Sequence, residues 1–172
     1  MRDVSERPVP SNNCNPGVTN VEYQGKWYFV QWKNRFVTKY TWSGAKVKKL
    51  IKVKYASNWQ ILSFQNSCAQ VGMKMISMDD PDKREFFLNM LERDRYDYFW
   101  AGAKLSGRSL RWENGVSEPI STGRYPWSDR GAQGPQPEGN GDCLAILNNV
   151  YNDRVKYHDV ACHHKKPTIC EC

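Results

Sequence analysis

The chain has 172 residues, which is enough for one domain and too few for two of ordinary size. Its formal net charge of +7 favours anionic partners such as acidic glycans, phosphates or membrane surfaces. No stretch reaches the ~18 consecutive apolar residues of a membrane helix, so we expect no membrane span.

The cysteines limit the choice of compartment. The chain has six, at positions 14, 68, 143, 162, 170 and 172, and none forms a C-x-x-C pair of the kind that binds zinc. An even number without metal spacing predicts three disulfides in an oxidising compartment, where nucleic acid is not an expected partner. Counting alone leaves the pairing open. Met1 to Cys14 is polar and lacks an apolar leader, so we expect a mature secreted chain without its signal peptide.

In chain order, residues 1–22 are predicted to form a polar arm, and 23–172 the domain. Residues 26–32 predict an aromatic-rich strand. Two β-favouring runs, 36–42 and 45–55, flank a turn signal at Ser43-Gly44 and predict a basic hairpin at about 35–55, although a short helix is an open alternative near 46–54.

Two helices are expected next. Apolar residues at helical spacing predict a helix that starts at Asn58 and ends at Gly72. Asp80-Pro81 predicts the cap and first turn of a second helix, and Met75–Met78 predicts a short buried strand between the two helices. Short apolar runs then predict antiparallel strands at 98–102, 110–112, 143–147, 155–157 and 168–170.

The segment 113–142 is rich in Gly, Pro, Ser and Asn. A loop of this length inside a compact domain is usually functional. Asn152-Asp153, in contrast, is interpreted as a polar turn between two strands.

Five motifs in one order resemble a family. Trp59 to Cys68, Phe99-Trp-Ala-Gly-Ala103, Trp112-Glu-Asn-Gly115, Gln136-Pro137-Glu138 and Tyr157-His158-Asp159-x-x-Cys162 are similar to motifs of C-type lectin-like domains. The chain most resembles the secreted arthropod type from about Lys26 onward. The resemblance implies an α+β fold of two helices on antiparallel sheets with a long irregular loop. It also implies disulfides Cys68–Cys170 and Cys143–Cys162, which leaves Cys14 and Cys172 as a third pair.

The resemblance further implies a calcium site in the loop, but this chain keeps it only in part. Ca²⁺ takes about six to eight oxygen ligands. Gln136, Glu138 and Asp159 offer oxygens, and Asp142 is adjacent to Gly141, which stands where the family has an acidic ligand. His158 presents nitrogen where oxygen is wanted. We therefore expect at most a degenerate calcium site, with the metal ligands Gln136, Glu138, Asp142 and Asp159.

Two surfaces are candidates for binding. The first is the loop, where an aromatic ring can stack on a sugar; its candidate residues are Trp127, Gln136, Pro137, Glu138, His158 and Asp159. Trp127 could instead anchor the loop to the core. The second is a lysine ridge in the basic hairpin, which could bind an anionic polysaccharide or only face solvent; it consists of Lys46, Lys48, Lys49, Lys52 and Lys54.

No nucleophile motif accompanies the three histidines, so we do not expect an enzyme. We expect an extracellular recognition module. Two hypotheses stay open for its partner: a glycan bound through the loop, or an extracellular protein bound without calcium through the hairpin or the loop surface.

Overall fold

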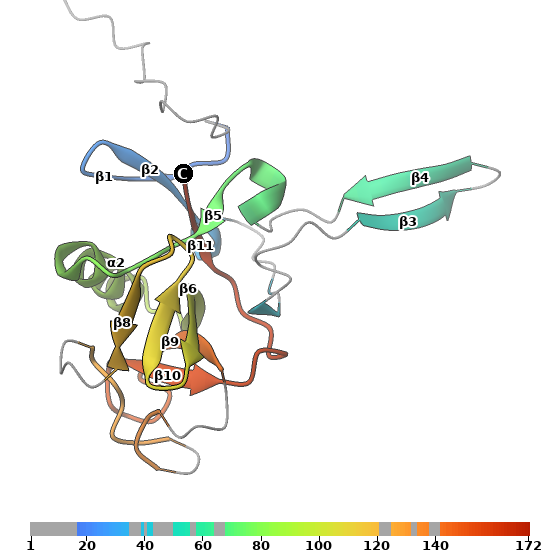
Figure 1. Cartoon of the computed structure of the whole chain (residues 1–172). Helices are drawn as coiled ribbons and strands as arrows, with labels where there is room; N and C mark the ends of the chain where they lie inside the picture. Colours follow the sequence, from blue (N-terminus) through green and yellow to red (C-terminus); the bar gives the residue numbers. More distant parts are fainter. Residues whose placement is uncertain are drawn as a thin grey trace, which may run out of the picture.

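The computed structural model describes residues 17–34, 39, 41–42, 50–55, 58–63, 68–120, 125–131, 134–137 and 142–172, with only the backbone of 50–55, 58–63 and Gln70. Two antiparallel sheets and a helix make up the body, which is the α+β arrangement predicted (Figure 1). No helix in the described part of the chain is long and apolar enough to cross a membrane.

The first sheet joins the two ends of the domain. Its strand order is β1-β2-β11-β5, which cover Val21–Tyr23, Lys26–Val30, Ile169–Glu171 and Lys74–Met75. Strand β11 therefore lies between a strand from the start of the domain and one from its middle. The predicted buried strand at Met75–Met78 is shorter than expected, although Ile76 and Met78 are fully buried. Because β1 includes Val21, the sheet begins inside the segment 1–22 that was predicted as a polar arm. Residues 1–16 of that segment lie outside the described residues.

The second sheet carries the loop. Its order is β10-β9-β6-β7-β8, which cover Val155–Val160, Cys143–Asn148, Tyr98–Ser106, Ser109–Trp112 and Ser117–Pro119. The segment 113–142, predicted as a loop, contains strand β8; its irregular part leaves after β8 and returns at β9, an interior strand of the sheet. Both of its ends are thus fixed by strands.

Gly102 in β6 allows the two sheets to approach. Its N–H donates to the carbonyl of Ile76 at 2.8 Å. A Cβ at position 102 would lie 2.6 Å from that oxygen and 2.9 Å from the carbonyl of Met75. Only glycine permits this backbone contact.

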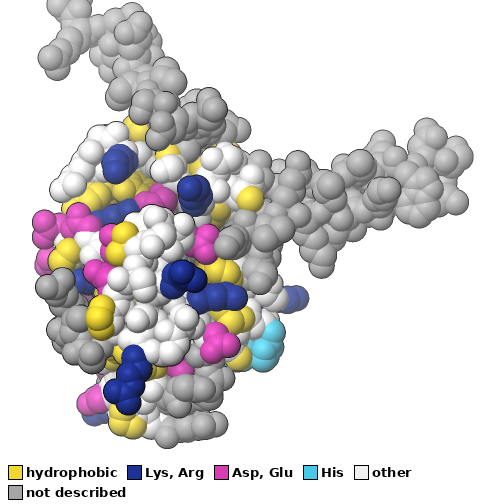
Figure 2. Space-filling model, viewed as in Figure 1, with side chains coloured by type: hydrophobic (Ala, Val, Ile, Leu, Met, Phe, Trp, Pro, Cys, Tyr) yellow, Lys and Arg dark blue, Asp and Glu magenta, His cyan; other side chains and the backbone are white. Residues whose placement is uncertain are grey.

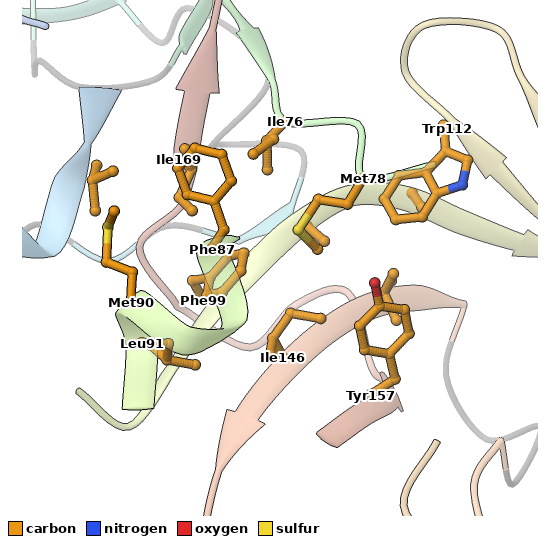
Figure 3. Packing of buried hydrophobic residues seen from close by; sticks show 14 of the residues in the cluster. Ile76, Met78, Phe87, Met90, Leu91, Phe99, Trp112, Ile146, Tyr157 and Ile169 are labelled. Atoms are coloured by element: carbon orange, nitrogen blue, oxygen red, sulfur yellow. The ribbon is translucent and has the colours of Figure 1, made fainter. Parts of the chain in front are cut away.

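Helix α2, Pro81–Arg93, confirms the second predicted helix. It packs its apolar face into a core shared with both sheets (Figure 3). Phe87, Met90 and Leu91 from the helix meet Ile146 of β9 and Ile169 of β11 there.

The first predicted helix is wrong over its first half. Residues Asn58–Ser63 form strand β4, which pairs with β3, Leu50–Tyr55, in a hairpin that projects from the body in Figure 1. A short apolar run fits both the helical and the strand period, and the β-favouring run 50–55 beside it provides a strand partner. The second half forms a 3-10 helix, η2, over Cys68–Val71, and Gly72 follows it at a φ of +72°.

The predicted turn at Ser43-Gly44 lies outside the described residues. Of the hairpin predicted at 35–55, the structure describes residues 39, 41–42 and 50–55. Residues 50–55 form β3, whose described partner is β4, whereas the Trp42 N–H donates to the carbonyl of Cys162.

The disulfides Cys68–Cys170 and Cys143–Cys162 are both present, as the resemblance implied. Both lie in a second buried cluster with Met75. Cys172 is disulfide-bonded too, while Cys14, its predicted partner, lies outside the described residues.

Candidate functional site

The loop 113–142 is tied to strand β10 by stacked aromatic rings. Tyr125 is buried, and its ring stacks on that of Tyr157 with 5.6 Å between centroids. The backbone N–H of Tyr157 donates to the carbonyl of Pro126 at 2.8 Å, and its carbonyl accepts from the N–H of Ser128 at 3.1 Å. The loop therefore runs beside β10 as an added strand-like segment.

Trp127 lies between these bonds and packs inward. Its ring meets Tyr157 edge-on, with 5.7 Å between centroids. The ring is half-buried against the core, and its indole nitrogen is covered. This placement favours the alternative in which Trp127 anchors the loop.

A buried cation lies beneath the same aromatic rings. Arg84 of α2 is only 7% exposed, and its guanidinium carbon is 4.8 Å from the centroid of the Tyr125 ring. Burial raises the pKa of Tyr157 above its ordinary value, and the positive charge of Arg84 opposes this rise in part. Tyr157 thus stays protonated and neutral under the loop.

Gln136 joins the loop to the end of β10. The peptide bond between Gln136 and Pro137 is cis. The backbone N–H of Gln136 donates to the carbonyl of Ser128 at 2.8 Å. Its side-chain Oε1 accepts from the backbone N–H of Asp159 at 3.1 Å. Two residues predicted to share a site are therefore in direct contact.

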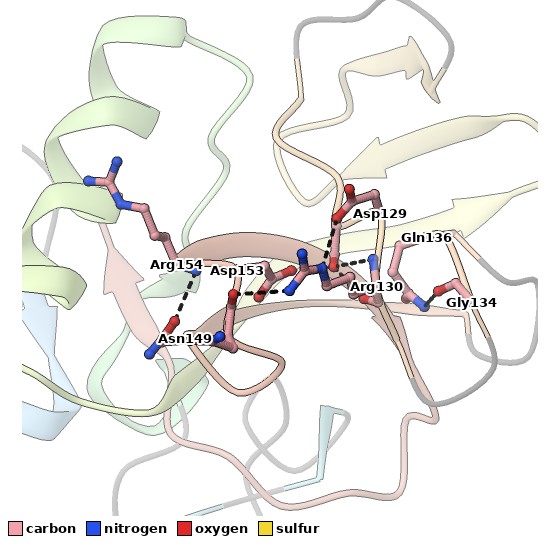
Figure 4. Close-up of polar contacts among 9 residues, drawn as sticks. Asp129, Arg130, Gly134, Gln136, Asn149, Asp153 and Arg154 are labelled. Atoms are coloured by element: carbon pink, nitrogen blue, oxygen red, sulfur yellow. Dashed lines mark hydrogen bonds and ion pairs between the residues drawn. The ribbon is translucent and has the colours of Figure 1, made fainter.

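Ser128 is a junction that the sequence did not indicate, and its partners Arg130 and Asp153 are labelled in Figure 4. Its hydroxyl contacts Oδ2 of Asp153 and the carbonyl of Arg130, and it accepts from the N–H of Arg130 at 2.9 Å. The Arg130 guanidinium reaches the carbonyl of Asn152 at 3.4 Å. The polar turn at Asn152-Asp153 thus supports the loop. The prediction of that turn was the only feature of the sequence that marked this part of the molecule.

The remaining predicted site residues are dispersed. His158 is 2% exposed and stacks on Tyr151, with 5.3 Å between ring centroids. The side chain of Asp142 is exposed, while its carbonyl accepts from the N–H of Leu105 at 2.8 Å. Glu138 lies outside the described residues, as do Lys46, Lys48 and Lys49 of the lysine ridge. Lys52 and Lys54 are in β3, where only the backbone is described.

The described residues do not assemble the oxygen set that Ca²⁺ requires. Oε1 of Gln136 already accepts the Asp159 N–H, and Asp159 is only 4% exposed. Within the ranges that the structure describes, no three His, Cys, Asp or Glu side chains gather as a metal-binding group. Since Ca²⁺ prefers about six to eight oxygens, these residues alone do not fit the ion.

Sequence comparisons place this fold among known proteins. The model of the family described as lectin C-type domain matches residues 55–172. L-selectin of Mus musculus is 25% identical over 114 residues, which cover 66% of this chain and 29% of that protein. The chain thus spans less than a third of the length of this relative.

Solved structures agree on the architecture. The C-type lectin domain of murine dendritic cell inhibitory receptor 2, solved with an N-glycan, has a TM-score of 0.59 at 14% identity and covers 92% of this chain and 98% of that one. A calcium-independent type II antifreeze protein has a TM-score of 0.56 at 13% identity over 92% of this chain and 93% of that one. These likenesses confirm the predicted C-type lectin-like fold.

Proposed function

The chain belongs to the C-type lectin domain family, and from this premise we propose that it is a secreted, non-catalytic recognition module that binds glycan through the loop 113–142. The observation that carries the proposal is the hydrogen bond from the Asp159 N–H to Gln136 Oε1. It holds the loop against β10 at the position that the family resemblance marks for sugar selection.

Preorganisation supports a binding role for this loop. Bonds to Tyr157, to Asp159 and within the Ser128 junction hold the described loop residues, 125–131 and 134–137, so these residues have little conformational entropy to lose when a ligand binds. Amide, hydroxyl and carboxylate groups gather there beside aromatic rings. Sugars are recognised by such combinations, in which rings pack on apolar faces and polar groups fix hydroxyls.

We propose that binding does not require Ca²⁺. Asp159 is buried and the Gln136 carbonyl oxygen is engaged within the protein, so the chain's own hydrogen-bonding groups would contact the sugar. The arthropod-type likeness and secretion stay predictions. Among the solved neighbours, one C-type lectin domain is in complex with an N-glycan, and that complex supports glycans as the first ligand class to test.

A protein partner bound without calcium is the second candidate. It is favoured by the inward packing of Trp127 and His158, which removes two predicted sugar contacts from the surface. A neighbour of the same fold is described as calcium-independent, which supports a role without the ion.

A glycan array probed with and without chelator tests the proposal. We expect binding that chelator leaves unchanged. We expect Gln136→Ala to weaken that binding by about three- to tenfold, because one hydrogen bond that holds the loop is lost. Asn89→Ala, on the exposed face of α2, is the matched control and should bind like the wild type. No glycan binding in either buffer would favour the protein partner, and binding that chelator abolishes would contradict calcium independence.

A further inference from the structure

A pocket on the outer face of β6 and β7 is separate from the Gln136–Asp159 contact. It has a volume of about 300 Å³ and is lined by Trp42, Lys104, Arg111, Trp112, Glu113 and Gly115. Figure 2 shows neighbouring basic side chains near the middle of this view, over the same sheet. No prediction from the sequence included any of these residues as a ligand.

Two cations from neighbouring strands line this pocket. Lys104 and Arg111 are register partners in the antiparallel pair β6–β7, so their side chains leave the same face of the sheet. Like charges directly opposite each other are destabilising. Neither residue has an ion-pair partner among those the structure describes. An anion between them would remove this repulsion.

The Trp42 side of the pocket is held by hydrogen bonds and burial. Trp42 is 3% exposed, its indole Nε1 donates to the carbonyl of Ala101 at 3.1 Å, and its backbone N–H donates to the carbonyl of Cys162 at 3.0 Å. Lys104 Nζ lies 4.7 Å from the centroid of the Trp42 ring. The ammonium is therefore positioned by a cation–π contact before any ligand arrives.

Glu113 indicates what kind of anion fits. Glu113 lines the same pocket, and its negative charge would repel a compact anion such as free phosphate. A sugar that carries one acidic group also has hydroxyls, and these can donate to a carboxylate. Arg111 can bind a carboxylate or a sulfate ester through two parallel hydrogen bonds.

We propose that this pocket binds an acidic sugar residue, whose carboxylate or sulfate ester lies between Lys104 and Arg111. The inference deepens the proposed function and rests on it, because it names the glycan class as acidic.

The position of the pocket suits a single glycan chain. Arg111, Lys104, Cys143 and Val160 are successive register partners across β7, β6, β9 and β10. With strands about 4.8 Å apart, the pocket lies roughly 10–15 Å from the end of β10 that holds the loop. One extended oligosaccharide can therefore reach both sites.

The test is fluorescence titration of the full chain with two acidic probes, a heparin hexasaccharide and a galacturonate hexasaccharide, beside neutral maltohexaose. We expect Lys104→Gln with Arg111→Gln to weaken binding of the acidic probes by about tenfold or more, since charge-assisted bonds are lost. The charge-matched control is Lys74→Gln with Arg95→Gln, two exposed sites, and it should bind like the wild type. The thermal midpoint of the pocket variant should equal or exceed that of the wild type, because like-charge repulsion is removed.

Three outcomes are decisive. If the pocket variant and the charge-matched control bind the acidic probes alike, the proposal is overturned. If binding is lost only when Lys52 and Lys54 are changed to Ser, the lysine ridge is the anion site and the pocket is not. A third outcome separates the two proposals. If the array shows no binding of neutral glycans, and the pocket variant, but not the charge-matched control, loses binding of the acidic probes, then glycan binding by the loop is contradicted and the anion site in the pocket is supported.

Discussion

Lys166 lies against the faces of two aromatic rings, with its Nζ 4.0 Å from the ring centroid of Tyr98 and 5.5 Å from that of Trp100. The residue is 7% exposed. Burial lowers the pKa of Lys166 to about 8, and the charge of Lys39 lowers it further. The aromatic faces offset part of this burial cost when the ammonium is charged.

This placement predicts a pH-dependent stability. Below pH 8 the lysine is charged in both states, and burying that charge costs stability in full. Between pH 8 and its ordinary value of 10.5, the folded state loses the proton before the unfolded state does, so stability rises with pH. The free energy of unfolding of wild type relative to Lys166→Met should increase by about 2 kcal/mol from about pH 7 to about pH 9.5, as measured by urea denaturation.

Lys165→Met is the control for this prediction because Lys165 is the exposed neighbour. Its stability difference from wild type should not change with pH. Equal pH dependence in wild type and Lys166→Met would show that Lys166 does not lose its proton early.

Contacts between candidate site residues were predictable where both residues belong to a recognised motif set, and not where only the fold brings the residues together. Gln136 and Asp159 are in direct contact, as shared membership of a motif set suggested. Ser128 and Asp153 are 25 residues apart and meet only through the fold. No local pattern encodes such a pairing, so the sequence could not reveal the junction that supports the loop.

At the scale of elements, α2 was predicted most fully because its start signal is local. The Asp80 side chain accepts from the N–H of Asp82 at 2.8 Å and from that of Lys83 at 3.5 Å, and Pro81 opens the first turn. Strand β4 was not predicted, because its apolar residues fit two periods and its pairing with β3 is a property of both segments together.

The cap predicts a specific stability effect. Asp80→Ala should lower the free energy of unfolding by about 1 kcal/mol, since an N-cap acceptor is lost. Asp80→Asn should change it little, because asparagine caps nearly as well. Denaturant unfolding of the two variants measures the difference. Equal losses would mean that the carboxylate charge, rather than the cap hydrogen bond, stabilises this end of the helix.

For the whole molecule, the disulfides join segments that are distant in the sequence. Cys68–Cys170 links residues 102 apart and ties η2 to β11 in the first sheet, whereas Cys143–Cys162 links residues 19 apart. The resemblance gave both pairings, while cysteine counting alone left them open. The family pattern, and not the local residues, supplied this part of the fold.

Loop length predicts the relative value of these two bridges. In the chain-entropy model, replacing Cys68 and Cys170 by Ser should cost about 4–5 kcal/mol, and replacing Cys143 and Cys162 about 3 kcal/mol. Guanidinium denaturation of the two double variants gives the comparison. A larger loss from the shorter bridge would mean that native packing in the second cluster outweighs the constraint on the unfolded chain.

The two sheets, the two bridges and the aromatic stack together hold the loop residues 125–128 and Gln136 beside β10. The most direct measurement of the loop's role is a set of proton–nitrogen correlation spectra of labelled protein, titrated with glycans selected on the array. We predict that the amide resonances of Ser128, Gln136 and Asp159 shift with added glycan while that of Asn89 on α2 does not. Shifts confined to α2 or the first sheet, with none in the loop or β10, would contradict glycan recognition by this loop.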